Sequence, residues 1–279
     1  MIINSFPKIV KNILEGLPKN DYPVLNSRLF VECWLAYALD NSLRSMRDLF
    51  KRLNNTGFDV DISTFSKANT HRSQKVFQKI YQQLNKLVQN KVHKKLHDKY
   101  AICPIDSTII TLTSKLLWVL GHHQVKLFSS LNLSTGIVRI KNNWKLEFGS
   151  ETGLIKIGSS KDAPVYRMIN FCDLETKTEF RLVTNLPADG EAAVTDNEIR
   201  DIYRLRWGVE LLWKFLKMHL KLDRLITKNV NGIAIQIYAS LIAYLILQLV
   251  SVPKEWGEKM LDKFRYLQAC MCQQISYVL

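Results

Sequence analysis

The stretch Asp201–Leu222 reads DIYRLRWGVELLWKFLKMHLKL, and its spacing predicts one long amphipathic helix. At about 100° per residue, side chains at steps of three, four and seven fall on one ridge of such a helix. That ridge carries Tyr203, Arg206, Glu210 and Lys217, beside a stripe of leucine, isoleucine and valine. One interpretation is a solvated helix edge with an ordinary Arg206–Glu210 pair. The other is a site that combines a carboxylate, two cations and a phenol.

The composition is that of a folded and strongly basic protein. Of the 279 residues, 47% are hydrophobic and 23% are charged, and the formal net charge is +14. This length allows one large domain or two smaller ones. The positive charge predicts a polyanionic partner, most simply nucleic acid, with an acidic membrane surface as the alternative.

The cysteines and the N-terminal residues predict a cytoplasmic protein. The 5 cysteines are scattered and form no C-x-x-C pair, which argues against a disulfide framework or a structural zinc site. The first residues lack the apolar run and cleavage site of a signal peptide.

Residues 233–252, IAIQIYASLIAYLILQLVSV, are long and apolar enough to span a membrane. Gln236 and Gln248 interrupt the segment, and a helix that is apolar all round is also typical of a buried core position. We therefore expect a core helix and no membrane partner.

Residues 1–99 read as helices and predict a DNA-binding region. Between Phe65 and Lys99 the chain has nine Lys or Arg against one acid, in a pattern of short helix, turn and longer helix. The charge predicts phosphate contacts. The candidate residues are Lys67, Arg72, Lys75 and Lys79. The alternative is an ordinary solvated face rich in lysine.

Strand-like sequence begins near Tyr100. The segments YAICPIDSTIITL and QVKLFSSLNL predict the first strands, over residues 100–136. Short strands rich in Lys and Arg continue over residues 137–190, and helices are expected over residues 191–279. Thr195 and Glu198 form a predicted capping box at the start of those helices.

Asp106 follows an apolar run, which is a common way to present a carboxylate at a sheet edge, although turn aspartates look similar. Magnesium takes hard oxygen ligands and usually one or two carboxylates from the protein. If Asp106 and Glu210 converge, a pair of ions would activate a water or a 3′-hydroxyl and stabilise the leaving oxygen of a phosphodiester. Arg206 and Lys217 would then hold phosphates.

The pattern Y-x-x-R-x-x-x-E-x-x-x-x-x-x-K resembles the signature of the IS-four group of bacterial insertion-sequence transposases. Tyr203, Arg206, Glu210 and Lys217 match its four positions. Asp106 in IDSTII is similar to the first catalytic Asp of that family. The segment Val125-Lys126-Leu127 is similar to its next core strand.

The resemblance implies an α/β or α+β fold: an RNase H-like core with a β-rich insertion and an N-terminal helical DNA-binding region. It implies Asp-Asp-Glu chemistry with Mg²⁺ or Mn²⁺ on double-stranded DNA, namely nicking, hairpin formation and strand transfer at the inverted-repeat ends of the element. A homodimer in the DNA complex and a location at the bacterial nucleoid are further expectations.

The resemblance also assigns roles to single residues. Asp106 and Glu210 would be metal ligands, whereas Tyr203, Arg206 and Lys217 would grip the terminal phosphates and the hairpin end. Lys126 is a further candidate for DNA contact.

The sequence departs from the family where a second Asp, often followed by Arg-Gly, is expected. The chain passes from Gly136 directly to Ile137–Ile140, which looks like the start of the insertion. The other acids of this type before residue 200 lie in loop-like or insertion sequence: Asp162, Asp173, Asp189 and Asp196. We expect an internal deletion of several tens of residues and a loss of activity.

Three functional classes follow from these observations. The first is a DNA transposase, inactive if the second Asp is lost. The second is a non-catalytic DNA-binding derivative that inhibits the full-length enzyme. The third, an unrelated RNase H-like nuclease, would explain Asp106 and Glu210 but not the other three residues of the signature.

Overall fold

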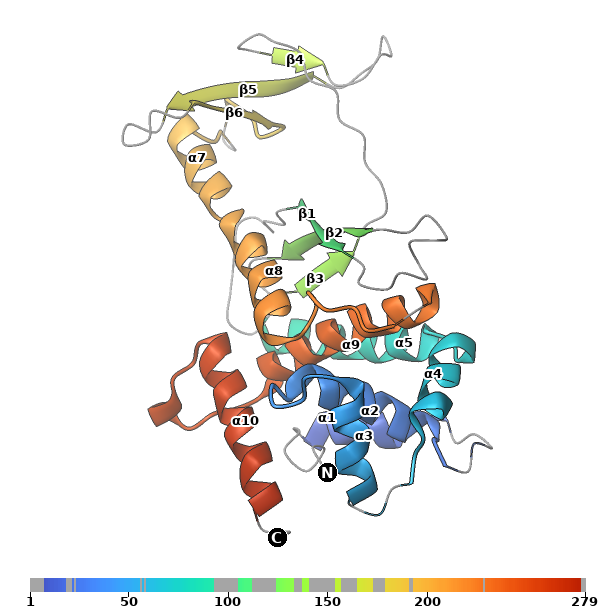
Figure 1. The fold of residues 1–279 in the computed structure, drawn as a ribbon. Helices are drawn as coiled ribbons and strands as arrows, with labels where there is room; N and C mark the ends of the chain where they lie inside the picture. Colours follow the sequence, from blue (N-terminus) through green and yellow to red (C-terminus); the bar gives the residue numbers. More distant parts are fainter. Residues whose placement is uncertain are drawn as a thin grey trace. The chain divides into compact units, whose positions relative to one another are not determined.

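The computed structural model divides the chain into two compact units, Met1–Ile140 with Val209–Leu279, and Lys141–Gly208 (Figure 1). Each unit is described by itself. The residues that the structure describes are 8–18, 22, 24–55, 57, 59–92, 105–111, 124–132, 137–140, 154–156, 165–172, 179–190, 193–227 and 229–276.

Helices make up most of the first unit. They are α1 (Lys8–Glu15), α2 (Ser27–Leu39), α3 (Met46–Asn55), α4 (Ile62–His71), α5 (Lys75–Val92), α8 (Trp207–His219), α9 (Val230–Leu249) and α10 (Met260–Ser276), with a 3-10 turn, η2, at Lys254–Trp256. Asn26 caps α2 by accepting a hydrogen bond from the backbone N–H of Leu29. Asp61 caps α4 in the same way, through the backbone N–H of Ser63.

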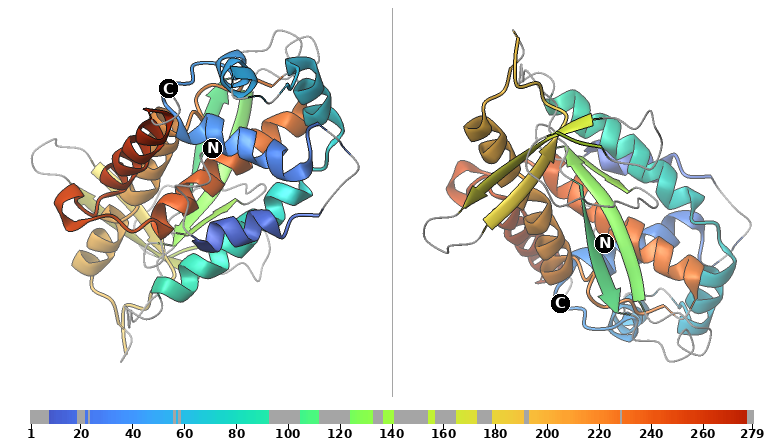
Figure 2. Two further views of the ribbon diagram at one scale, coloured as in Figure 1. Left: turned by 90° about the horizontal axis from the view of Figure 1, so that it is seen from below. Right: turned by 90° about the horizontal axis from the view of Figure 1, so that it is seen from above.

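Helix α9 is the centre of the first unit. It packs against α2, α4, α5 and α10, and it lies on one face of the first sheet (Figure 2). Among the described helices, only α9 is long and apolar enough to cross a membrane, and 72% of its most apolar window is buried inside the protein. This burial confirms the expected core helix.

The first sheet has the order β1-β2-β3 and is antiparallel. Its strands are β1 (Ile105–Thr111), β2 (Gln124–Asn132) and β3 (Ile137–Ile140). Ile110, Leu127 and Leu131 are buried and join the core around α9. Strand β3 corrects one expectation: it does not begin the β-rich insertion but pairs with β2, with Ile137 opposite Asn132.

The second unit contains a sheet of order β4-β5-β6 and one helix. Its elements are β4 (Leu154–Lys156), β5 (Val165–Cys172), β6 (Glu179–Thr184) and α7 (Asp196–Arg204). Thr195 and Glu198 form the predicted capping box at the start of α7. Arg167 on β5 donates to the Val194 carbonyl at 2.8 Å, and a small core of Ile169, Val194 and Ile199 joins sheet to helix.

The predicted single helix over Asp201–Leu222 is wrong, because the structure has two helices with a break at Leu205–Arg206. The backbone N–H of Arg206 donates to the Tyr203 carbonyl and that of Gly208 to the Leu205 carbonyl, so the chain makes tight turns here instead of helical i→i−4 bonds. Gly208 has a low helix propensity, which favours a break. Tyr203 therefore belongs to a different helix from Glu210.

The described part of the chain is thus mostly helical with two small sheets, an α+β arrangement. The predicted helical character of the N-terminal region is confirmed by α1 to α5.

Candidate active site

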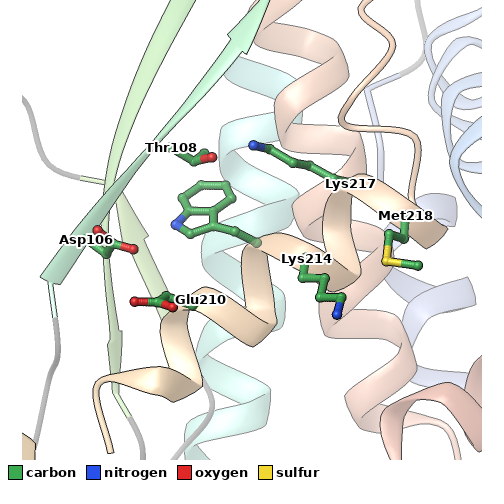
Figure 3. Close-up of a pocket in the computed structure, with 7 residues that line it drawn as sticks. Asp106, Thr108, Glu210, Lys214, Lys217 and Met218 are labelled. Atoms are coloured by element: carbon green, nitrogen blue, oxygen red, sulfur yellow. The ribbon is translucent and has the colours of Figure 1, made fainter. Parts of the chain in front are cut away.

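A pocket of about 370 Å³ lies in the first unit between strand β1 and helix α8 (Figure 3). Its lining residues are Asp106, Thr108, Glu210, Trp213, Lys214, Lys217 and Met218. All of them come from these two elements, which are about 100 residues apart in the sequence.

The local periodicities explain why these residues meet. Side chains two apart on a strand share a face, so Asp106 and Thr108 both point toward α8. On α8, positions three, four, seven and eight after Glu210 fall on its side of the helix. Asp106, Glu210 and Lys217 were predicted from the sequence. Thr108, Lys214 and Met218 were not, although this spacing places them beside the predicted residues.

The carboxylates of Asp106 and Glu210 face each other across the pocket (Figure 3). Both side chains are partly buried. Within the described residues, no group of three or more His, Cys, Asp or Glu is arranged to hold a metal ion. Two facing carboxylates still suit Mg²⁺ or Mn²⁺, because such ions take oxygen ligands and complete their shell with water.

Two lysines line the same pocket. Lys217 extends toward β1 and donates from Nζ to the Ile109 carbonyl at 3.2 Å, whereas Lys214 is exposed and points away (Figure 3). Positive charge therefore lies beside the two carboxylates, as a phosphate-binding site requires.

Trp213 forms part of the pocket wall and of the core. Only 4% of its surface is exposed, and its indole N–H is buried without an acceptor among the described residues. A buried unpaired donor is uncommon in folded proteins.

The other two signature residues, Tyr203 and Arg206, lie in the second unit. The Arg206 guanidinium stacks over the Tyr203 ring with 5.2 Å between its central carbon and the ring centroid. The expected ridge of four residues on one helix is therefore divided: Arg206 lies over the Tyr203 ring in the second unit, whereas Glu210 and Lys217 line the pocket of the first.

Three of the predicted DNA-contact lysines are exposed on the helices of the N-terminal region: Lys67 on α4, and Lys75 and Lys79 on α5. Lys126 is exposed on β2. Residues 93–99 of the basic stretch lie outside the described residues.

Arg72 is engaged in the fold. Its guanidinium lies 4.2 Å from the centroid of the Tyr22 ring and 4.9 Å from that of Phe30, and it donates to the carbonyls of Leu25 and Asn26.

Asp189 and Asp196, two of the acids considered as a second Asp, are not among the residues that line this pocket. Asp189 is an exposed loop residue, and Asp196 pairs with Arg167 in the second unit. Asp162 and Asp173 lie outside the described residues.

Comparison with known proteins identifies the family. Residues 46–246 match the family described as "Transposase DDE domain". A Synechocystis protein described as a transposase of insertion sequence element IS4SA is 44% identical over 333 residues, covering 99% of this chain and 97% of that protein. Two Escherichia coli proteins, InsL of element IS186A and the transposase of element IS421, are each 34% identical over 87 residues, or 31% of this chain and 23% of the relative. No solved structure matches the chain. The chain therefore belongs to the insertion-sequence transposases that carry a DDE domain.

Proposed function

We propose that this transposase cuts and joins DNA at the ends of its insertion sequence, and that Asp106 and Glu210 hold the divalent metal ions of that reaction. The observation that carries the proposal is the pocket between β1 and α8, where these two carboxylates face each other beside Lys214 and Lys217.

The two carboxylates fit Mg²⁺ or Mn²⁺ by their chemistry. Bound metal would supply the activation of a water or 3′-hydroxyl and the stabilisation of the leaving oxygen. Asp106 and Glu210 would hold the ions from a strand and a helix, which are rigid supports. Lys217 would attract the phosphate of the scissile strand, while the buried side of the pocket at Thr108 and Trp213 limits access of bulk water.

An RNase H-like catalytic core remains our interpretation of the fold, supported by the strand that carries Asp106 and the helix that carries Glu210. Double-stranded DNA is the partner, contacted by Lys67, Lys75 and Lys79 of the N-terminal helices and by Lys126. Tyr203, Arg206 and Lys217 would contact the terminal phosphates of the element. The protein would act as a homodimer in the DNA complex. Because Arg72 is engaged with Tyr22 and Phe30, we assign it a structural role.

We further propose that this copy has lost residues from its catalytic core, including the second Asp. The alignment with the Synechocystis relative spans 333 positions against 279 residues here, so at least 54 positions of that relative (333 − 279) have no counterpart in this chain. Because β3 pairs directly with β2, a gap between Gly136 and Ile137 is a poor fit. A gap after Ile140, where the first unit is interrupted, fits better.

The second candidate function is a non-catalytic DNA-binding derivative that inhibits a full-length transposase. The observation that favours it is that the described residues bring two acids to the pocket, Asp106 and Glu210, where Asp-Asp-Glu chemistry uses three.

The test is cleavage of DNA that carries the element ends, with Mg²⁺ or Mn²⁺, by the wild type and by Asp106→Asn and Glu210→Gln. Each substitution removes a metal-binding charge worth several kcal/mol in the transition state, so any cleavage should fall at least about 100-fold. Binding of the uncut ends should remain. Asp59→Asn and Glu258→Gln, which change exposed acids of the first unit outside the pocket, are the matched controls.

The outcomes separate the two functions. The inhibitor function would be supported if the wild-type protein binds the ends without cutting them and suppresses cleavage by the longer Synechocystis relative. Equal cleavage by the wild type and both pocket variants would overturn the proposed site.

A further inference from the structure

The indole N–H of Trp213 belongs to a side chain that lines the pocket between β1 and α8. In the part of the chain that the structure describes, this donor is buried and has no acceptor. Trp34, another buried tryptophan of the same core, donates from Nε1 to Oδ1 of Asn69 at 3.0 Å. A phenylalanine in place of Trp213 would bury a ring without the cost of an unpaired donor, so packing alone does not explain the nitrogen.

Acceptors of two kinds line the pocket that Trp213 helps to form: the carboxylates of Asp106 and Glu210, and the hydroxyl of Thr108. The side chain of Asp106 makes no hydrogen bond or ion pair with any described residue, whereas its backbone belongs to the ladder between β1 and β2. A carboxylate has two oxygens and several lone pairs, so it can accept from an N–H and bind a cation at the same time.

We infer that Trp213 is a positioning residue for Asp106: its indole N–H donates to one carboxylate oxygen when the site is loaded, which leaves the other oxygen for the divalent cation. The inference rests on the proposed function of the pocket. A hydrogen bond to the carboxylate would fix the rotamer of the ligand and strengthen metal binding, as partners of metal ligands generally do. DNA is a poor alternative acceptor, because the Trp213 nitrogen has almost no exposed surface.

Substitution of Trp213 by phenylalanine keeps a smaller aromatic ring and removes the donor. We expect Trp213→Phe to weaken Mn²⁺ binding to the full-length, DNA-free protein about 10- to 100-fold, measured by electron paramagnetic resonance of free Mn²⁺. The matched control is Trp34→Phe, which removes a buried indole donor outside the pocket and should leave the Mn²⁺ affinity unchanged. Loss of affinity in both variants, or in neither, would overturn the inference.

A second measurement uses the wild type and does not depend on the folding of Trp213→Phe. In protein labelled with ¹⁵N-tryptophan, Mg²⁺ should move one of the 6 indole N–H resonances downfield, as a new hydrogen bond to a carboxylate requires. Asp106→Asn should abolish that shift. The absence of any shifted indole resonance at saturating Mg²⁺ would also overturn the inference.

The same titrations separate this inference from the proposed function. If Asp106→Asn and Glu210→Gln lose Mn²⁺ binding while Trp213→Phe keeps it, the result supports the proposed metal site and contradicts the positioning role of Trp213. If Asp106→Asn and Glu210→Gln bind Mn²⁺ like the wild type, the proposed metal site itself fails.

Discussion

At the scale of single residues, Lys221 links the end of α8 to the end of α2. Its φ of 57° is left-handed, and the N–H of the next residue, Leu222, donates back to the Leu216 carbonyl, which closes the helix. The Lys221 ammonium donates to the Asp40 carbonyl at 2.6 Å and to the Leu43 carbonyl. It also lies 4.4 Å from the centroid of the Tyr37 ring. A lysine here satisfies carbonyls that a helix end leaves exposed.

The protonation of Lys221 should make the free energy of unfolding depend on pH. Burial lowers the pKa of Lys221 to about 8, below the ordinary lysine value of 10.5. Between these values the unfolded chain holds a proton that the folded chain has released, so the free energy of unfolding rises with pH from about 8 to 10.5. Because the side chain is partly solvated, we expect a rise of only about 1 kcal/mol relative to Lys221→Met, measured by urea denaturation. Parallel pH profiles of the two proteins would contradict this assignment.

The sequence allowed prediction of some residues of the pocket but not others. Asp106 and Glu210 were identified because carboxylates in a family signature are distinctive. Arg72 could not be assigned to the fold, because its partners Tyr22 and Leu25 lie more than forty positions away in the sequence and only the tertiary structure brings them together.

At the scale of elements, periodicity predicted the types of element better than their ends. The buried faces of α5 and α9 and the capping box of α7 follow directly from the spacing of residues. The break at Leu205–Arg206 does not, because a pair of tight turns preserves the apolar spacing on both sides. The spacing of apolar residues therefore predicted one helix where the structure has two, α7 and α8.

Helix α5 presents a basic face to solvent. Lys75, Lys79 and Lys86 are exposed and lie within about 40° of one another around the helix axis, opposite the buried Phe77, Ile80, Leu84 and Val88. A face of this kind suits the evenly spaced phosphates of duplex DNA.

Substitution of two of these lysines should change the salt dependence of DNA binding. If Lys75 and Lys79 each contact a phosphate, Lys75→Ala/Lys79→Ala should reduce the slope of log K against log salt by about 2 for DNA of any sequence. Fluorescence anisotropy over a range of NaCl concentrations measures this slope. The control is Lys254→Ala/Lys259→Ala, which removes two exposed lysines near η2 and should leave the slope intact. An equal reduction in both variants would mean that the effect comes from net charge alone.

At the scale of the whole molecule, the first unit is built from both ends of the sequence. Helices α2, α4 and α5 pack on α9, which follows them by more than a hundred residues and supplies a large share of the buried apolar side chains. Such a unit depends on long-range contacts for its stability.

Truncation should expose this dependence. A fragment of residues 1–208 lacks α9, α10 and nearly all of α8, so its N-terminal helices keep an apolar surface without a partner. We expect no cooperative thermal transition of α1 to α5 by circular dichroism. The control is a chain in which Lys141–Gly208 is replaced by a flexible Gly/Ser linker; it retains the whole first unit and should unfold cooperatively. A cooperative transition in the 1–208 fragment would contradict the central role of α9.

The discontinuity of the first unit also sets an order of events on the ribosome. Asp106 is synthesised about 5–20 s before Glu210 at ordinary rates of translation, and α9 follows later still. Throughout that interval the nascent chain already carries the lysines of α4 and α5, but it has neither the pocket nor the helix on which its first half packs. Translation that stops within the second unit would therefore yield a basic polypeptide that carries Asp106 but lacks Glu210 and the pocket that the two residues line.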